Sequence, residues 1–232
     1  MANPNPNLNP NLLARGFADP VHDGQAVFRA AMEALSRPGR IRPLVTALVT
    51  ALAPPGPLTP ELAALALALT DAETPVWLDA PLRADPAVAG FLRFHTGAPL
   101  VAAPGAAAFA LIADPAHCPP LTDFAQGTPA YPDASATLIL AVDALSDEEG
   151  PDFSGEGFAG QGFAGPGIRG TARFAAGPLP ADWAARWAAN QAGFPLGIDC
   201  LFVAPGRLAG LPRSARPVAA EALRDPEALP CT

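Results

Sequence analysis

The chain has 232 residues, half of them apolar, with 14 basic and 22 acidic side chains and a formal net charge of −8. This acidic balance argues against nucleic acid or an anionic membrane as the main partner. Every basic residue is an arginine, and the absence of lysine excludes both a Schiff base to pyridoxal phosphate and a lysine-bearing P-loop.

The three cysteines, Cys118, Cys200 and Cys231, are widely separated and form no CxxC motif. An odd, scattered set predicts a reducing compartment and no disulfide framework. The first residues lack the charged start and apolar core of a secretory signal. The longest apolar runs, such as 62–69, fall far short of the ~18–20 residues that span a bilayer. We therefore expect a cytoplasmic protein without a membrane partner.

The chain begins with an asparagine–proline alternation over residues 1–11. Asn-Pro pairs favour turns, and proline removes backbone donors. Residues 1–16 are therefore predicted to form a disordered tail, followed by a single domain over 17–232.

A first helix is predicted over about 23–36, with Asp23 as its cap and Pro38-Gly39 as its exit. Spacings of three and four place apolar side chains on one face of it: Val27, Phe28, Ala31 and Leu35. Arg37, Arg40 and Arg42 follow within six residues. A helix that ends on such a basic turn is a candidate anion site.

Further helices and strands alternate along the rest of the chain. Helices are predicted at 59–70, 85–94 and about 180–191, with a helical turn at 121–126. Strands are predicted at 74–78, 100–102, 107–113 and 136–142, and a hairpin joins 198–203 to 208–211. This order favours an α/β three-layer sandwich with a mixed β-sheet over an all-α or all-β fold.

Residues 146–170 are predicted to form a glycine-rich loop. The pattern GxGxxG occurs three times there, at 155–160, 160–165 and 165–170. A dinucleotide site needs a strand directly before this pattern and a helix directly after it. An acidic run precedes it here, and the next helix begins some ten residues late, so we reject a dinucleotide site and expect a flexible or β-edge loop instead. The turn at 165–168 remains suited to wrap closely around a neighbouring backbone.

No set of residues in the chain predicts catalysis or metal binding. His22, His95 and His117 share no ligand spacing, and a GxSxG motif is absent. Arg213 and Arg216 follow the last strand. With Arg37 and Arg40 they are candidates for an arginine fork that holds a phosphate or carboxylate. Salt bridges to the surplus of acidic side chains are the alternative.

Seven stretches in order resemble one family, PhnH, the H subunit of the carbon–phosphorus lyase system. They are PVHDGQ (20–25) with SRPG (36–39), TPVWL (74–78), FHTGAPL (94–100), ATLIL (136–140), GPGI (165–168), FPLGID (194–199) and LPR (211–213). The chain also departs from the family pattern. Gly24 stands where the family usually has serine, and Ser214-Ala215 replaces a usual Thr-Thr. The glycine repeat resembles an insertion before Gly165.

The resemblance implies a fold similar to the pyridoxal-phosphate-dependent transferases but without cofactor. It also implies an accessory subunit of phosphonate breakdown that acts with the G, I and J subunits and is a homodimer when isolated. The resemblance assigns the nucleosidase chemistry to the I subunit and no catalytic residue to this chain. The alternative is an enzyme that binds an anion, a phosphonate or nucleotide, through the arginine site.

Overall fold

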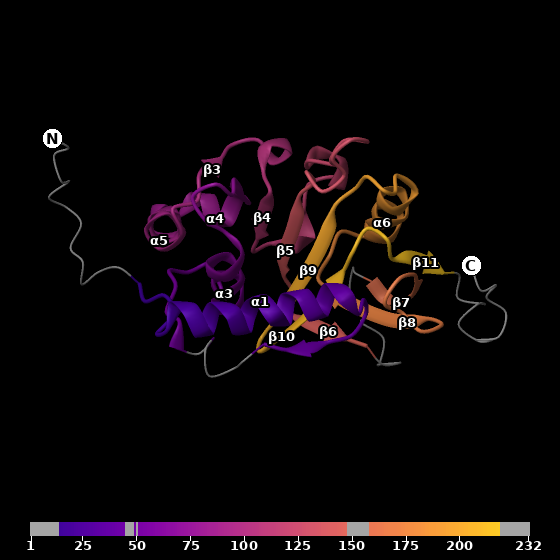
Figure 1. The fold of residues 1–232 in the computed structure, drawn as a ribbon, viewed down its shortest axis with the longest axis horizontal. Helices are drawn as coiled ribbons and strands as arrows, with labels where there is room; N and C mark the ends of the chain where they lie inside the picture. Colours follow the sequence, from indigo (N-terminus) through magenta and orange to yellow (C-terminus); the bar gives the residue numbers. More distant parts are fainter. Residues whose placement is uncertain (1–13, 45–48, 50, 148–157, 219–232) are drawn as a thin grey trace, which may run out of the picture.

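The computed structural model describes residues 14–44, 49, 51–147 and 158–218 (Figure 1). Most of the predicted tail lies outside this part of the chain. Ala14, inside the predicted tail, already contacts the domain, because its carbonyl accepts a hydrogen bond from Nε2 of His95 at 3.0 Å. In the described part of the chain, no helix has the length and apolar character needed to cross a membrane.

A seven-stranded mixed sheet forms the centre of the molecule, in the order β1-β10-β9-β5-β4-β2-β3. Strands β3, β2, β4, β5 and β9 run parallel to one another. At one end of the sheet β10 pairs antiparallel with β9, and β1 pairs antiparallel with β10. The bounds are β1 Arg42–Pro43, β2 Val76–Leu78, β3 Leu100–Val101, β4 Phe109–Ile112, β5 Thr137–Ala141, β9 Asp199–Ala204 and β10 Arg207–Leu211. The α/β class and the mixed sheet are thus confirmed.

Helices cover one face of this sheet. Ile139 and Leu201 of the central strands pack there against α1, α3 and α5. Helix α3 follows its prediction closely: the Thr59 hydroxyl accepts the N–H of Leu62 and Pro60 is the first helical residue. The bounds are α1 Pro20–Ser36, α3 Pro60–Leu69, α4 Ala80–Ala84 and α5 Pro86–Thr96.

The opposite face packs against helix α6 and a second sheet that the sequence did not predict. Phe202 of β9 points to this side, where Trp183 and Trp187 are fully buried. The second sheet is antiparallel, in the order β11-β7-β8-β6, and Figure 1 shows it beside α6, toward the labelled C-terminus. The bounds are β6 Ala144–Ser146, β7 Phe158–Ala164, β8 Ala172–Gly177, α6 Trp183–Ala192 and β11 Arg216–Val218; short 3-10 turns are Pro104–Ala106, Pro115–His117 and Leu121–Asp123.

The start and the buried face of α1 differ from the prediction. Asp19, rather than Asp23, is the N-cap, and its Oδ1 accepts the N–H groups of Val21 and His22, both at 3.1 Å. Proline is favoured at the first helical position, so the cap is the residue before Pro20. Asp23 instead accepts the N–H of Asp19 at 3.0 Å, as the acidic partner of a capping box does.

Phe28 was predicted on the buried face of α1, and this was wrong. The buried stripe consists of Val27, Ala31 and Ala34, whereas Phe28 is 48% exposed. The sheet lies under the small residues of the helix, so the bulky neighbours on the adjacent face remain outside the core.

The predicted glycine-rich loop at 146–170 was wrong over part of its length. Residues 158–164 form β7, which pairs with β8 on one side and with β11 on the other. Strand pairing uses backbone groups, so a repeat with few side chains can still join a sheet. The predicted close wrapping of 165–168 is confirmed: a Cβ on Gly167 would overlap the carbonyl oxygen of Ser36.

Candidate functional site

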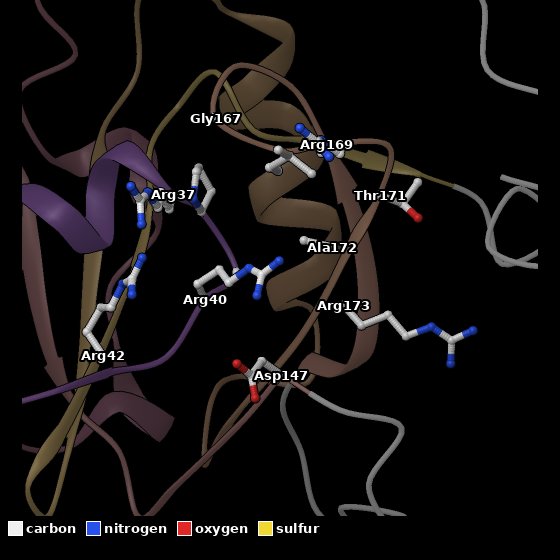
Figure 2. A pocket seen from close by; sticks show the side chains of 12 residues that line it. Arg37, Arg40, Arg42, Asp147, Gly167, Arg169, Thr171, Ala172 and Arg173 are labelled. Atoms are coloured by element: carbon white, nitrogen blue, oxygen red, sulfur yellow. The ribbon is translucent and has the colours of Figure 1, made fainter. Parts of the chain in front are cut away.

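A cavity of about 760 Å³ opens where α1 ends (Figure 2). On one side is the exit turn of α1 and the start of β1. The segment that leads into β8 forms the other side. The lining residues are Arg37, Pro38, Gly39, Arg40, Arg42, Asp147, Gly167, Ile168, Arg169, Thr171, Ala172 and Arg173.

Two glycines bring these segments together. Pro38 ends α1, and Gly39 takes the left-handed conformation (φ 75°) that turns the chain toward β1. A Cβ on Gly39 would lie 3.0 Å from the Cβ of Ala172, beside β8. Gly167, also left-handed, lies against the Ser36 carbonyl. Close approach of the two backbones therefore places the basic exit turn opposite Arg169 and Arg173.

The charge of this cavity is opposite to that of the whole chain. Five arginines line it together with one carboxylate, that of Asp147. The Asp147 carboxylate accepts the backbone N–H of Ile41 at 3.3 Å. Within the described residues, no ion pair joins a carboxylate to Arg37, Arg40, Arg42 or Arg169. A chain of net charge −8 thus concentrates positive charge at one place.

Arg42 carries a buried donor that no acceptor satisfies. Its Nε is buried and has no hydrogen-bond partner among the described residues. Figure 2 shows the guanidinium groups of Arg37 and Arg42 near one another, Arg40 extending from the exit turn toward Ala172, and Arg173 pointing outward. Like charges arranged in this way repel, and an anion between them is the group that would satisfy the donors.

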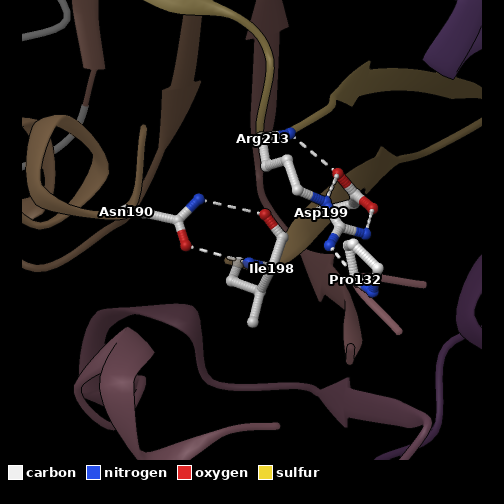
Figure 3. Close-up of polar contacts among 5 residues, drawn as sticks. All are labelled: Pro132, Asn190, Ile198, Asp199 and Arg213. Atoms are coloured by element: carbon white, nitrogen blue, oxygen red, sulfur yellow. Dashed lines mark hydrogen bonds and ion pairs between the residues drawn. The ribbon is translucent and has the colours of Figure 1, made fainter. Parts of the chain in front are cut away.

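The other arginine expected to bind an anion, Arg213, is held in an internal ion pair (Figure 3). Its Nη2 lies 2.6 Å from Oδ2 of Asp199, and its Nε lies 3.2 Å from Oδ1 of the same carboxylate. Nη1 donates to the Pro132 carbonyl at 2.7 Å. The side chains of Arg213 and Asp199 are only 15% and 18% exposed. These bonds fix the exit of β10 against the start of β9.

The structure therefore brings together Arg37 and Arg40 but does not add Arg213 or Arg216 to them. Arg216 is exposed at the start of β11, outside the set that lines the cavity. Arg169 and Arg173 take that place, and sequence reasoning missed both. Their segment was interpreted as a loop and β8 was not predicted, so nothing indicated that it would return to the end of α1.

Two exposed histidines and the buried Asp79 outside the cavity have structural partners. His22 and His117 each lie 2.7 Å from the carboxylate three residues before them, that of Asp19 and Asp114 respectively. The Asp79 carboxylate caps α4 and also accepts the N–H groups of Ala113 and Asp114 at 2.7 and 2.8 Å. Burial nevertheless raises the pKa of Asp79. No three His, Cys, Asp or Glu side chains within the described ranges gather as metal ligands would.

Comparison with known proteins decides the family. A family model described as "Bacterial phosphonate metabolism protein (PhnH)" matches residues 15–218. The chain belongs to the PhnH family. It is also 40% identical over 205 residues to "Alpha-D-ribose 1-methylphosphonate 5-triphosphate synthase subunit PhnH" of Rhizobium meliloti (strain 1021), covering 88% of this chain and 95% of that relative. The resemblance carried by the seven motifs is thereby confirmed. The matched span of this PhnH family member includes both sheets and all five arginines of the cavity.

Proposed function

We propose that this chain is the PhnH subunit of an alpha-D-ribose 1-methylphosphonate 5-triphosphate synthase, an accessory subunit of the carbon–phosphorus lyase system in organic phosphonate breakdown. The observation that carries this proposal is the 40% identity to a relative of that name, over 95% of its length. The family match over residues 15–218 supports it independently.

The proposal includes the setting in which the subunit works. It acts in the cytoplasm with the G, I and J subunits, forms a homodimer when isolated and contributes no catalytic residue of its own. Its parallel strands, covered on both faces, suit a fold akin to that of the pyridoxal-phosphate-dependent transferases. It acts without that cofactor, because a chain without lysine cannot form the internal aldimine.

An exposed apolar face on α1 supports a role in protein contacts. Val21, Phe28 and Met32 are 61%, 48% and 41% exposed. They lie four to seven residues apart, and Phe28 and Met32 line a groove of about 490 Å³ beside Leu67 and Ala68 of α3. Large apolar side chains gathered on a surface are typical of interaction sites.

Co-expression tests the proposal directly. The tagged chain is produced with the G, I and J subunits of its own operon, purified through the tag and weighed by native mass spectrometry. The expected result is a complex that contains all four chains, and a homodimer when the chain is produced alone. If the G, I and J subunits associate with one another but never with this chain, the proposal fails.

A surface variant sharpens that experiment. Phe28→Ser with Met32→Ser removes the apolar side chains of α1 without touching its buried stripe, and should reduce recovery of the complex or the dimer. Tyr131→Ser is the matched control, because Tyr131 is 68% exposed and lies outside α1.

A second candidate function is favoured by one specific observation, the gathering of arginines at the end of α1. It is the binding of an anion through Arg37 and Arg40, as the sequence predicted. Because Arg213 is paired with Asp199, replacing Arg213 would disturb the fold rather than test the ligand.

A further inference from the structure

We propose that the cavity at the end of α1 binds the triphosphate arm of a ribose 5-triphosphate, with Arg37, Arg40 and Arg42 as its main contacts. The choice of ligand rests on the proposed function, since the relative's printed name specifies a sugar that bears both a phosphonate and a 5-triphosphate. The existence of an anion site rests on the cavity alone.

The number of arginines favours a chain of phosphates over a single one. A terminal phosphate offers about three acceptor oxygens, and one arginine fork can use two of them. Five arginines belong to the lining of this cavity, four of them besides the outward-pointing Arg173, and Asp147 is the one acid among the lining residues. That donor set matches the several negative charges and many oxygens of a triphosphate.

The buried Nε of Arg42 gives independent support. A guanidinium cannot lose its proton at physiological pH, so burial does not neutralise it. A buried donor without an acceptor costs free energy, and native proteins rarely keep one. Arg42 Nε is such a donor among the described residues, and it belongs to the lining of the cavity. An anion in the cavity, beside the rest of this guanidinium, would offset the charge that this burial desolvates.

The dimensions and the surroundings narrow the class of ligand. A cavity of about 760 Å³ is in the ~300–1,000 Å³ range of small-molecule sites. Inorganic phosphate would leave most of it empty. A long polyanion such as nucleic acid would meet the surface of a chain with net charge −8, and is disfavoured.

Figure 2 assigns different parts to the five arginines. The Arg37 and Arg42 guanidinium groups lie near one another at the end of α1, and Arg40 extends from the exit turn toward Ala172, across the cavity. Arg169 lies at the rim formed by the segment before β8, and Arg173 points outward. We therefore expect Arg169 to add to affinity less than the first three arginines.

Isothermal titration of the full chain at low ionic strength tests the site with three probes: tripolyphosphate, ATP and inorganic phosphate. We expect tripolyphosphate and ATP to bind, and inorganic phosphate to bind at least about tenfold more weakly. ATP binding more tightly than tripolyphosphate would place the sugar in the cavity as well. Equal affinity for tripolyphosphate and inorganic phosphate, or no binding of any probe, overturns the proposal.

Arginine-to-methionine variants locate the site. Arg40→Met and Arg42→Met should each weaken tripolyphosphate binding about tenfold or more. Arg93→Met is the control, because Arg93 is an exposed arginine on α5, outside the cavity lining, and should not change the affinity. Arg216→Met tests the fork first expected from the sequence and should also have no effect. A loss in the controls equal to that in Arg40→Met would overturn the site.

The same variants separate this inference from the proposed function. Circular dichroism and thermal unfolding confirm that each variant is folded. The double variant Arg40→Met/Arg42→Met should still join the G, I and J subunits while losing tripolyphosphate. If wild type forms the complex but binds no triphosphate, the site fails and the proposed function stands. If triphosphate binds but no complex forms, the proposed function fails and an anion site remains.

Discussion

Arg42 and Arg213 are both partly buried, and each lies next to strand β10. Arg42 begins the edge strand β1, whereas Arg213 follows β10, the strand with which β1 pairs. Arg213 makes two bonds to the Asp199 carboxylate and one to the Pro132 carbonyl. Arg42 has a buried Nε that finds no acceptor within the described residues.

The difference separates an arginine that holds the fold from one that is free for a ligand. Once a charge is buried, its partner decides its effect on the free energy of unfolding. For Arg213, the free-energy cost of burying the charge is offset by the Asp199 carboxylate. Within the described residues Arg37, Arg40 and Arg42 have no such carboxylate, and this is the physical basis for assigning them to an anion.

The largest effect is expected for Arg213→Met, which keeps the apolar stem and removes the charge. It leaves the Asp199 carboxylate without its ion-pair partner, with only the backbone N–H of residue 213 still donating to Oδ1. We expect the free energy of unfolding to fall by about 2–4 kcal/mol, slightly less than for a fully buried pair because both side chains are partly exposed. Urea denaturation measures it.

A double-mutant cycle with Asp199→Asn serves as the control for Arg213→Met. The loss in the double variant should be smaller than the sum of the two single losses, because they share one interaction. Strictly additive losses would show that Arg213 stabilises the fold in some other way.

A comparable loss of stability is expected for Asn190, a buried side chain whose hydrogen-bond partners are backbone groups. The Asn190 side chain donates to the Ile198 carbonyl at 3.0 Å and accepts the Ile198 N–H at 2.9 Å (Figure 3). Asn190→Ala leaves two buried backbone groups unpaired, so the free energy of unfolding should fall by about 2–3 kcal/mol. Chemical denaturation of this variant beside Gln191→Ala, the neighbouring helix residue, checks the size. Equal stability of the two variants would contradict it.

The two buried thiols differ from the buried arginines, because a thiol is neutral when it keeps its proton. Burial raises the pKa of Cys118 to about 12 and that of Cys200 well above the ordinary thiol value of 9.0. Above pH 9 the unfolded chain therefore loses thiol protons that the folded chain keeps, so stability falls as pH rises. The slope is at most ~1.4 kcal/mol per pH unit for each thiol.

The free energy of unfolding, measured by denaturation at several pH values between 9 and 12, gives that slope. Cys118→Ala should make it shallower, whatever its effect on stability at neutral pH. An unchanged slope in this variant would show that the Cys118 thiol does not cause it.

Local signals made several elements predictable. Helix α3 begins as Thr59-Pro60 indicates, and the β9–β10 hairpin turns at Gly206, which has φ 68°. Cap chemistry and turn chemistry depend on residues a few positions apart, so one sequence is enough to find them. The N-cap of α1 was predicted at Asp23, one turn after the observed cap Asp19, because both aspartates are suitable cap residues.

The candidate site was only half predictable for a different reason. Arg37 and Arg40 could be found from the sequence, because they directly follow the end of a helix that the sequence predicts. Arg169 and Arg173 join them only because β7 and β8 form a sheet, and the glycine repeat of β7 carries no alternation of polar and apolar side chains. Likewise, no short-range pattern distinguishes Arg213, whose partner Asp199 lies 14 positions away.

The most direct measurement of this contrast is the free energy of unfolding of Arg42→Met beside that of Arg213→Met and wild type, in one buffer without phosphate. The account predicts that Arg42→Met stays within ~1 kcal/mol of wild type or exceeds it, because the substitution removes a buried donor that has no acceptor. Arg213→Met should lose about 2–4 kcal/mol. Equal losses in the two variants would contradict the distinction between a structural arginine and one available to an anion.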